Sequence, residues 1–452
     1  MQKLIYLSLL SSALLVIGCT ERLDLAPLSA IGENGFYKNV TEVEGAVIAI
    51  YDGLQDVPQR EFALTEMRSD NTRTRSSEGD WAQFESFDVE PTNTAIAAYW
   101  SANYNVIFRA NRVLENLEVV NSTTLKSQFE GEARFTRALA HFNLVQAFGD
   151  VPLVDQVIIQ TDSSYFDRDP VATVLSTIAA DLSAARTLLP ATLDYGRATS
   201  GAASALLAKV MLTQGDYAGA EGVLNELTTS GAYALEASYR DVFYNEGNGE
   251  VIFAIPYLDD DANESQDFSF EMTAGGAISG LNYMTDEFLA AMDPLDSMRN
   301  DVLLSPAHPA EGGKFLTQSA DARLCGNDWI VLRYADVLLL QAEAIMAGAP
   351  STQDLDAIAA YNEVRERANL STLAVDGSET LTREMLLFER RYELAFENHR
   401  FNDLLRFGVA ESVLSEFAAN YSFPFTATDL LLPIPQGEIN VSQGKLSQNP
   451  GY

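Results

Sequence analysis

The strongest constraint on the fold is a helical pattern that returns along the chain in units of two helices. In the clearest unit, a run rich in alanine and leucine begins near Ala202 and stops at Gly215, and a second apolar run ends at Leu227. The glycine allows a tight turn, and small residues such as Ala220 let the two helices cross closely. A unit of this kind cannot bury its apolar face alone, so we expect several units to stack around one core.

A second unit is marked at both of its ends. Ser127 and Glu130 form an S-x-x-E capping box, and apolar residues then recur at helical spacing until Gly149 and Pro152 stop the run. We therefore expect a helix that starts near Ser127, with a partner helix over residues 99–117.

The pattern continues in the second half of the chain. Helices are expected over residues 334–346, 354–368 and 383–398, and Gly348 and Pro350 close the first of them. These helix pairs resemble tetratricopeptide units. The expected fold class is therefore mainly α, an α-superhelical scaffold of tetratricopeptide-like helix pairs with long irregular loops and a few short strands.

Three stretches between the helices have a different composition. Residues 60–94, 239–328 and 423–452 are rich in glycine, proline, asparagine, aspartate and aromatic residues. They are predicted to be long loops with short strands, such as Glu250 to Ile255. Loops of this length inside a compact protein are unusual unless they carry function, so we look for a binding site there.

The N-terminus predicts export and lipidation. Lys3 precedes an apolar stretch from Leu4 to Ile17, which is typical of a secretion signal. Val16 to Cys19 then resembles a bacterial lipobox, so residues 1–18 are expected to be removed and Cys19 to carry lipid. Acyl chains would anchor the protein firmly, since each buried methylene contributes roughly 0.8 kcal/mol. No other segment approaches the ~20 consecutive apolar residues of a membrane span.

Charge and cysteine content narrow the possible partners. The chain has 29 Lys and Arg against 64 Asp and Glu, a net charge of -35. Nucleic acids and anionic lipid headgroups are therefore poor partners. If Cys19 is lipidated, no second cysteine is left in the chain to form a disulfide with Cys325, and the fold must form without disulfides.

No pattern of residues points to catalysis. The three histidines lie far apart without zinc-ligand spacing, and no nucleophile elbow, Walker loop or dinucleotide fingerprint is present. The loop that starts at Asp259 begins like a calcium loop, but Glu264 stands where the turn needs glycine. We expect no enzyme activity, no metal and no cofactor. The sequence alone neither supports nor excludes a pair of carboxylates placed as in a glycosidase.

The loops instead contain residues suited to binding carbohydrate. Flat aromatic rings stack on the apolar faces of sugars, and Arg, Asn and Asp side chains satisfy hydroxyl groups. The predicted ligand-binding residues are Asp70, Arg73, Trp81, Tyr283 and Trp329. By contrast, Trp100 lies on a helix between Tyr99 and Tyr104 and is expected in the core.

Ordered blocks of sequence along nearly the whole chain resemble the SusD/RagB family of outer-membrane nutrient-binding lipoproteins. Any one block would be weak, but their order and spacing are highly specific. They are Tyr99 to Arg112, Gly131 to Ala138, Phe148 to Leu153, Leu332 to Asp336, Ala342 to Ala344, Asn362 to Ala368, Glu389 to Glu397, Arg400 to Arg406, Pro433 to Pro435 and Gln448 to Tyr452.

The resemblance implies a fold, a division of the chain and a function. A SusD-like N-terminal helical region is expected over residues 19–235 and a RagB/SusD C-terminal region over residues 236–452, together forming one compact unit. The charged block from Glu389 to Glu397 is expected to hold the scaffold, with ion pairs along its helix or to neighbouring helices. The family implies a surface lipoprotein that captures oligosaccharides for a TonB-dependent outer-membrane transporter of the SusC-like type.

Other functions stay open from the sequence alone. The same import role with a peptide or glycopeptide ligand is one alternative. A glycoside hydrolase is another, and a periplasm-facing scaffold that binds proteins is a third. The residues after Cys19, Thr20 to Asp24, are only partly acidic, whereas surface-exported family members often have several acidic residues there.

Overall fold

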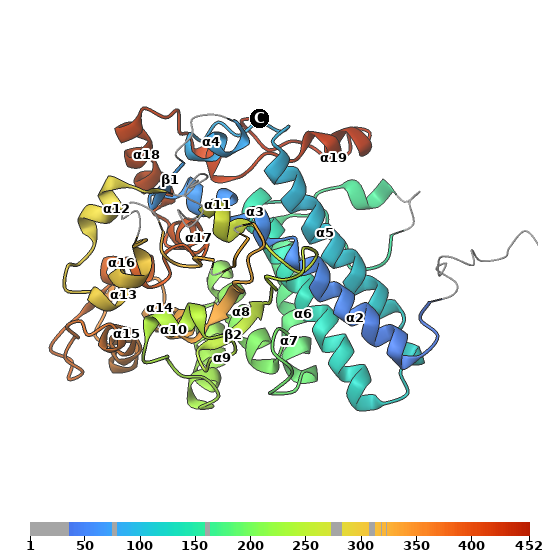
Figure 1. Ribbon diagram of the computed structural model, residues 1–452, viewed down its shortest axis with the longest axis horizontal. Helices are drawn as coiled ribbons and strands as arrows, with labels where there is room; N and C mark the ends of the chain where they lie inside the picture. The colour runs from blue at the N-terminus through green and yellow to red at the C-terminus, as the bar shows by residue number, and fades with distance from the viewer. Residues whose placement is uncertain are drawn as a thin grey trace, which may run out of the picture.

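The computed structural model describes residues 36–74, 79–158, 163–272, 283–306, 312–317, 319–321 and 323–452. The predicted signal and the lipidation site at Cys19 lie outside these residues. The protein is mainly α (Figure 1). Its longer helices are α2 (Val40–Gln55), α5 (Thr94–Glu115), α6 (Thr123–Phe148), α7 (Val171–Leu188), α8 (Ser200–Gln214), α9 (Tyr217–Thr229), α14 (Tyr334–Met346), α15 (Leu355–Arg367), α16 (Arg383–Glu393) and α18 (Ala410–Tyr421).

Short elements fill the segments between these helices. The short helices are α3 (Pro58–Leu64), α4 (Gly79–Glu85), α10 (Tyr239–Tyr244), α11 (Phe268–Met272), α12 (Asp286–Ala291), α13 (Ser297–Leu303), α17 (Arg400–Arg406) and α19 (Gln436–Val441). The 3-10 turns are η2 (Glu66–Arg68), η3 (Leu117–Val119), η4 (Ser163–Phe166) and η5 (Ala427–Leu430). Most of these short helices and turns lie within the segments that were predicted to be long loops.

The described strands form three antiparallel pairs of two strands each. These are β1 (Thr72–Arg73) with β3 (Tyr283–Met284), β2 (Val251–Ile255) with β4 (Trp329–Arg333), and β5 (Ser351–Thr352) with β6 (Leu381–Thr382). The strand predicted near residues 250–255 is confirmed as β2. It pairs with the strand that leads directly into α14.

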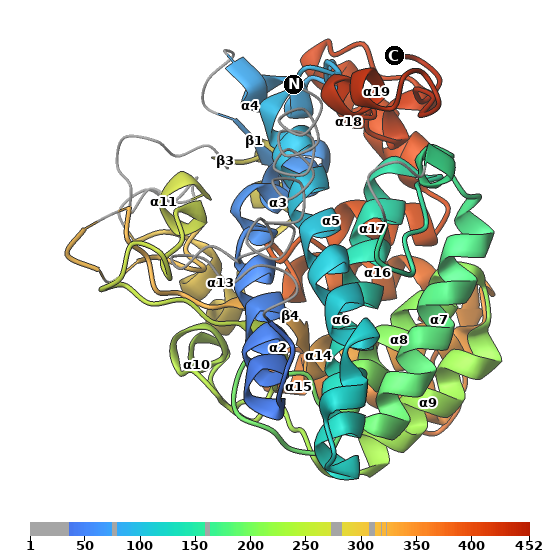
Figure 2. The same cartoon turned by 90° about the vertical axis from the view of Figure 1, so that its right-hand side faces the viewer.

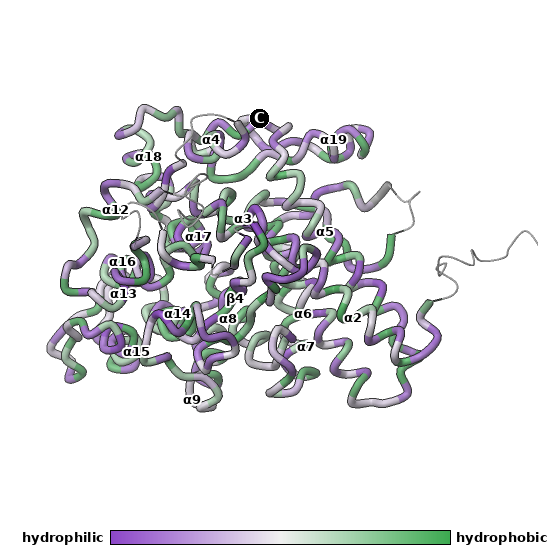
Figure 3. Tube along the Cα trace, viewed as in Figure 1, coloured by the Kyte–Doolittle hydropathy of each residue, from purple (hydrophilic) through white to green (hydrophobic). Residues whose placement is uncertain are grey.

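The long helices pack in a continuous row. Each of α5, α6, α7, α8 and α9 packs against the next, and α2 packs on α5 (Figure 2). The row continues from α9 to α14 and α15, which come more than 100 residues later in the chain. Apolar and polar residues alternate along α2 and α5 (Figure 3). Stacking therefore buries the apolar stripe of each helix against two neighbours.

The predicted two-helix unit is confirmed at α8 and α9. Gly215 follows α8 with φ 78°, and its N–H donates to the last turn of the helix. Asp216 then caps α9 through a hydrogen bond from the Gly219 N–H. Residues with side chains rarely adopt this left-handed backbone, so the glycine sets the turn. The predicted helices over residues 334–346 and 354–368 also match α14 and α15.

Three predicted helix boundaries were wrong. Helix α5 starts at Thr94, five residues before the predicted start at Tyr99. Helix α6 starts at Thr123 with Ser122 as its cap, so Ser127 lies inside the helix and Glu130 pairs with Arg134 instead of capping. Helix α16 ends at Glu393, five residues before the predicted end. The backbone turns left-handed soon afterwards, at Phe396 and Asn398.

Helix α7 is the one described helix with the length and apolar composition of a membrane span. It packs between α6 and α8 and buries Val174, Ile178 and Leu182 there. The Asp181 carboxylate on this helix accepts from Arg134 and Arg137 at 2.8 Å. These contacts make α7 a scaffold helix.

One apolar core runs through both halves of the chain. Its buried residues extend from Val43 in α2 to Leu446 near the C-terminus, and they include Trp100, as predicted. A smaller cluster joins Phe87 to α17 and α18. The scaffold therefore depends on contacts between distant segments.

A network of buried ion pairs connects the two-stranded β2–β4 sheet with the end of α16. The Arg333 guanidinium contacts Glu250 at 2.8 Å and both Glu393 and Glu397 at 2.6 Å, and none of these side chains is more than 1% exposed. Lys314 adds a pair with Glu397 at 2.6 Å and donates to the Ala395 carbonyl oxygen. We name this set the Arg333 network. It confirms that the charged block near residue 393 holds the scaffold, through contacts to other elements.

The Arg333 network also explains why α16 ends early. The carbonyl oxygen of Glu393 accepts from the Tyr239 hydroxyl, Arg333 and Lys314. These side chains take the place of the main-chain donors that a longer helix would supply. Burial opposes the charge on Glu397, but Arg333 and Lys314 outweigh it and hold its pKa below the ordinary value.

We expect Arg333→Ala to lower the free energy of unfolding by about 3 to 5 kcal/mol, because it leaves three buried carboxylates without their shared partner. Urea denaturation followed by circular dichroism measures this loss. Arg186→Ala is the control, since Arg186 pairs with a largely exposed Glu226 and should cost about 1 kcal/mol or less. Equal losses in the two variants would contradict the role given to the network.

Candidate functional site

Three of the five predicted ligand residues, Arg73, Trp81 and Tyr283, lie on one face of the molecule. This face, which we call the outer loop face, is built by α3, η2, β1, α4 and β3, and α11 lies beside it (Figure 2). Arg73 and Tyr283 are direct partners in the β1–β3 ladder. Arg73 also binds Glu85, which lies one helical turn after Trp81 on α4.

Trp81 is half-buried and fixed by an aromatic stack. Its ring lies nearly parallel to that of Phe62 from α3, with centroids 5.4 Å apart and planes 18° apart. The Arg60 guanidinium lies 5.7 Å from the Trp81 ring centroid and pairs with Asp267 at 2.8 Å. Arg60 and Asp267 were not among the predicted residues, since they stand 207 positions apart and only the fold places them together. The result is a fixed aromatic ring with a cation and a carboxylate beside it.

Arg73 is held between a carboxylate and a second aromatic ring. Its Nε donates to Glu85 Oε1 at 2.7 Å, and its guanidinium lies 4.0 Å from the centroid of the Tyr421 ring on α18. The Tyr421 hydroxyl donates to Glu287 at 2.8 Å. The Arg73 side chain keeps 39% exposure, so part of it is accessible to solvent. Tyr421 is a candidate ligand residue that sequence analysis missed.

Asp70 has a different position from the other residues of this group. Its carboxylate accepts from Arg400 at 2.7 and 2.9 Å and pairs with Arg391 at 3.0 Å. Burial would raise the pKa of Asp70, but Arg391 and Arg400 outweigh it and lower the pKa. Asp70 therefore fixes the loop before β1 to the scaffold with its side chain turned inward.

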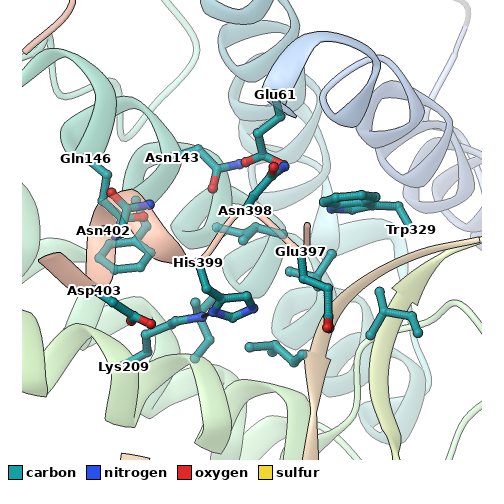
Figure 4. A pocket seen from close by; sticks show the side chains of 16 residues that line it. Glu61, Asn143, Gln146, Lys209, Trp329, Glu397, Asn398, His399, Asn402 and Asp403 are labelled. Carbon is teal, nitrogen blue, oxygen red and sulfur yellow. Dashed lines mark hydrogen bonds between the residues drawn. The ribbon is translucent and has the colours of Figure 1, made fainter. Parts of the chain in front are cut away.

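Trp329 is buried beneath the loops and does not reach the outer loop face. It is 3% exposed and packs edge-on against Phe268, with centroids 5.2 Å apart. Trp329 also lines a buried polar cavity (Figure 4). The sequence could not separate Trp329 from Trp81, because both follow polar loop residues.

The buried polar cavity has a volume of about 60 Å³. Figure 4 shows polar side chains from several elements directed toward it: Glu61, Asn143, Gln146, Lys209, Glu397, Asn398, His399, Asn402 and Asp403. A space of this size holds a few water molecules, which the polar walls can bind. It is too small for a sugar ring, so it is part of the support beneath the loops.

The cavity keeps its titratable groups in defined states. Burial and the neighbouring Lys209 lower the pKa of His399 to about 3, so its imidazole is neutral and can accept from Lys209 at 3.2 Å. Burial raises the pKa of Glu61, whose carboxylate accepts from Tyr99 and Asn398 at 3.1 Å. Among the residues in the described ranges, no group of three or more His, Cys, Asp or Glu is placed to hold a metal.

Glu66 connects the residues around the polar cavity with the segment that leads into β1. It lies in η2, six residues before β1, and is fully buried. Its Oε1 accepts from the Asn398 main-chain N–H at 3.0 Å, and Ser69 and Thr72 donate to its carbonyl oxygen. Burial raises the pKa of Glu66 to about 7. The carboxyl is therefore protonated in mildly acidic solution, where an exposed glutamate would be ionised.

Comparison with known proteins agrees with this architecture. Residues 313–452 match the model of the SusD family, and residues 24–212 match a model described as starch-binding associating with outer membrane. A SusD-like protein, P2, from Formosa agariphila is 26% identical, and the match covers 97% of this chain and 98% of that protein. The chain belongs to the SusD/RagB family.

Solved structures similar to this SusD/RagB family member include proteins whose names state a ligand. A laminarin-binding SusD-like protein is 27% identical, with a TM-score of 0.75, over 92% of this chain and 100% of the other. A surface glycan-binding protein A from Bacteroides thetaiotaomicron, solved with laminarihexaose, has a TM-score of 0.76 at 22% identity over 91% and 99% of the two chains. The second likeness concerns the fold alone.

We expect Glu66→Gln to become more stable relative to the natural protein as pH rises. A carboxyl whose pKa is raised in the folded state loses stability as pH rises from the unfolded value of 4.5 through about 7. Between pH 5 and pH 8 the difference should grow by about 2 to 3 kcal/mol. Urea denaturation at both pH values measures it, and Glu44→Gln at an exposed position controls for the lost charge. A pH-independent difference would contradict the buried neutral carboxyl.

Proposed function

We propose that this protein is a cell-surface lipoprotein that binds neutral oligosaccharides and delivers them to a TonB-dependent outer-membrane transporter. The observation that carries the proposal is the outer loop face, where Trp81 and Arg73 are held rigidly and remain partly open to solvent. Ligand binding of this kind requires position and complementarity rather than a reaction.

The geometry of the outer loop face suits a sugar ring. Trp81 is stacked on Phe62 and cannot turn freely, so little conformational entropy is lost when a ligand packs on it. Arg60 and Asp267 stand beside it as hydrogen-bonding groups. An aromatic plane with forked polar groups matches the apolar face and the hydroxyls of a pyranose.

The relatives support a carbohydrate ligand and an outer-membrane location. A relative with 27% identity over the whole of its chain is named for laminarin binding. One family model that matches this chain carries a description that combines starch binding with the outer membrane. The net charge of -35 favours a neutral ligand over an anionic polysaccharide.

The proposal also includes the lipid anchor at Cys19, the partner transporter and the division of the chain into two regions. The pattern that ends at Cys19 supports a lipid tether, and a lid on a transporter needs no second membrane contact. Residues 19–235 and 236–452 would then act as one rigid unit. The shared apolar core, to which α8 and α14 both contribute, supports this.

We expect Trp81→Ala to weaken oligosaccharide binding about 30-fold or more, because loss of a central aromatic contact costs about 2 kcal/mol. Isothermal titration of the soluble protein, without residues 1–19, against neutral oligosaccharides including laminarihexaose measures the change. Trp81→Phe keeps an aromatic plane and should lose less affinity. Phe388→Ala removes another exposed aromatic ring on α16 and should bind as the natural protein does.

Two results would overturn parts of the proposal. If no sugar binds and peptides bind instead, the carbohydrate assignment is wrong while an import role remains. If Trp81→Ala binds sugar normally, the site lies elsewhere on the molecule. Release of reducing ends by the pure protein would point to a hydrolase.

A further inference from the structure

A second aromatic site lies on the outer side of α5, away from every predicted ligand residue. It is a groove of about 400 Å³, which we call the α5 groove. Phe108 from α5 forms one wall, and Tyr165 and Phe166 from η4 line the groove with it. Trp100, Tyr104 and Leu446 also line it, and Trp100 and Leu446 are buried.

Phe108 is exposed to an unusual degree for its size. It is 49% exposed, whereas its helix neighbour Ile107 is fully buried in the core. Together with Ser101, Tyr104 and Asn105 it forms a stripe at helical spacing that faces outward. A stripe of hydroxyl, amide and aromatic groups differs from the charged surface typical of an exposed helix face.

The inner part of the groove is rigid. The Tyr104 hydroxyl donates to the Pro152 carbonyl oxygen at 2.9 Å, and the Trp100 ring lies 4.9 Å from the Tyr104 ring and 5.0 Å from Phe148. These contacts fix both aromatic rings before any ligand arrives. The groove is therefore preformed, which lowers the entropic cost of binding.

Polar groups stand beside the aromatic surfaces. Asn105 Oδ1 accepts from Arg109 at 2.9 Å, which orients the amide. Ser101 and Glu438 also line the groove, and Glu438 is the one charged residue among its described lining residues. Because these described lining residues include a carboxylate and no cation, they disfavour anionic ligands. Aromatic walls with a few hydroxyl, amide and carboxylate groups match a neutral sugar.

The α5 groove and the outer loop face are connected through α5. Asp80, next to Trp81, accepts from the Thr94 main-chain N–H at 2.9 Å at the start of α5. Phe108 lies 14 residues further along the same helix, roughly 21 Å at 1.5 Å per residue. One rigid helix thus supports both sites.

We propose that the α5 groove is a second binding site for a neutral pyranose unit, separate from the site at Trp81. This inference rests on the proposed function, since both sites would serve glycan capture. A long glycan that contacts both sites would be held more tightly than a short one, because the second contact becomes intramolecular.

Isothermal titration with laminarihexaose and other neutral hexasaccharides tests the inference through the number of sites. The natural protein should bind two molecules of a recognised hexasaccharide. Phe108→Ala and Trp81→Ala should each bind one, and the double variant none. Phe388→Ala, which removes an equally exposed phenylalanine, should still bind two.

Ser101→Trp gives an independent variant, because it fills the groove from an exposed position without removing a core contact. It should bind one molecule, with affinity at the remaining site unchanged within about twofold. Thermal unfolding of each variant checks that the fold is intact.

Several results would overturn the second site. A single site in the natural protein that disappears in Trp81→Ala leaves the proposed function standing and removes this inference. Two sites that persist in both Phe108→Ala and Ser101→Trp place the second site elsewhere. If Phe108→Ala loses co-purification with a transporter while sugar stoichiometry is unchanged, the groove docks protein. If no hexasaccharide binds the natural protein, the second site fails together with the carbohydrate assignment of the proposed function.

Discussion

The rest of the structure depends on the buried guanidinium of Arg333. It stands where β4 leads into α14 and contacts the carboxylates of Glu250 just before β2, Glu393 at the end of α16 and Glu397 after it. Three elements that are distant in the sequence therefore meet at one side chain. The adjoining pairs of Arg299, Arg367 and Lys314 bind the same carboxylates. Such networks cost desolvation energy, so their value here lies in fixing one arrangement of the elements.

The segment after α16 connects the Arg333 network with the residues before β1. Glu397 is held by Arg333, and the next residue, Asn398, donates to Glu66 and Glu61. Arg400 then clamps Asp70 just before β1. A continuous chain of contacts thus runs from the centre of the scaffold to the base of the outer loop face.

The two aromatic sites are supported in different ways. Trp81 stands on a short helix whose position depends on the clamps at Asp70 and Glu85. Phe108 stands in the middle of a 22-residue helix that packs in the main row. Both sites are therefore held in place, the first by contacts between short elements and the second by the packing of α5 in the row.

The sequence by itself determined the helical units, because apolar spacing, caps and glycine turns act over a few residues. The bounds of α14 and α15, the turn at Gly215, the strand β2 and the burial of Trp100 followed from such local patterns. The sequence could also predict that Arg73, Trp81 and Tyr283 lie on one face, because loops between helices gather at the surface of the scaffold.

Only the tertiary structure decided where the charged and aromatic side chains point. Asp70 turns inward because Arg391 and Arg400 come from more than 300 residues away, and Trp329 is covered by Phe268 and its neighbours. The early end of α16 likewise depends on side chains supplied by other elements. The exposure of the Phe108 ring depends on how the other described elements pack around α5. Local periodicity carries no information about such distant partners, so side-chain roles at the sites required the fold.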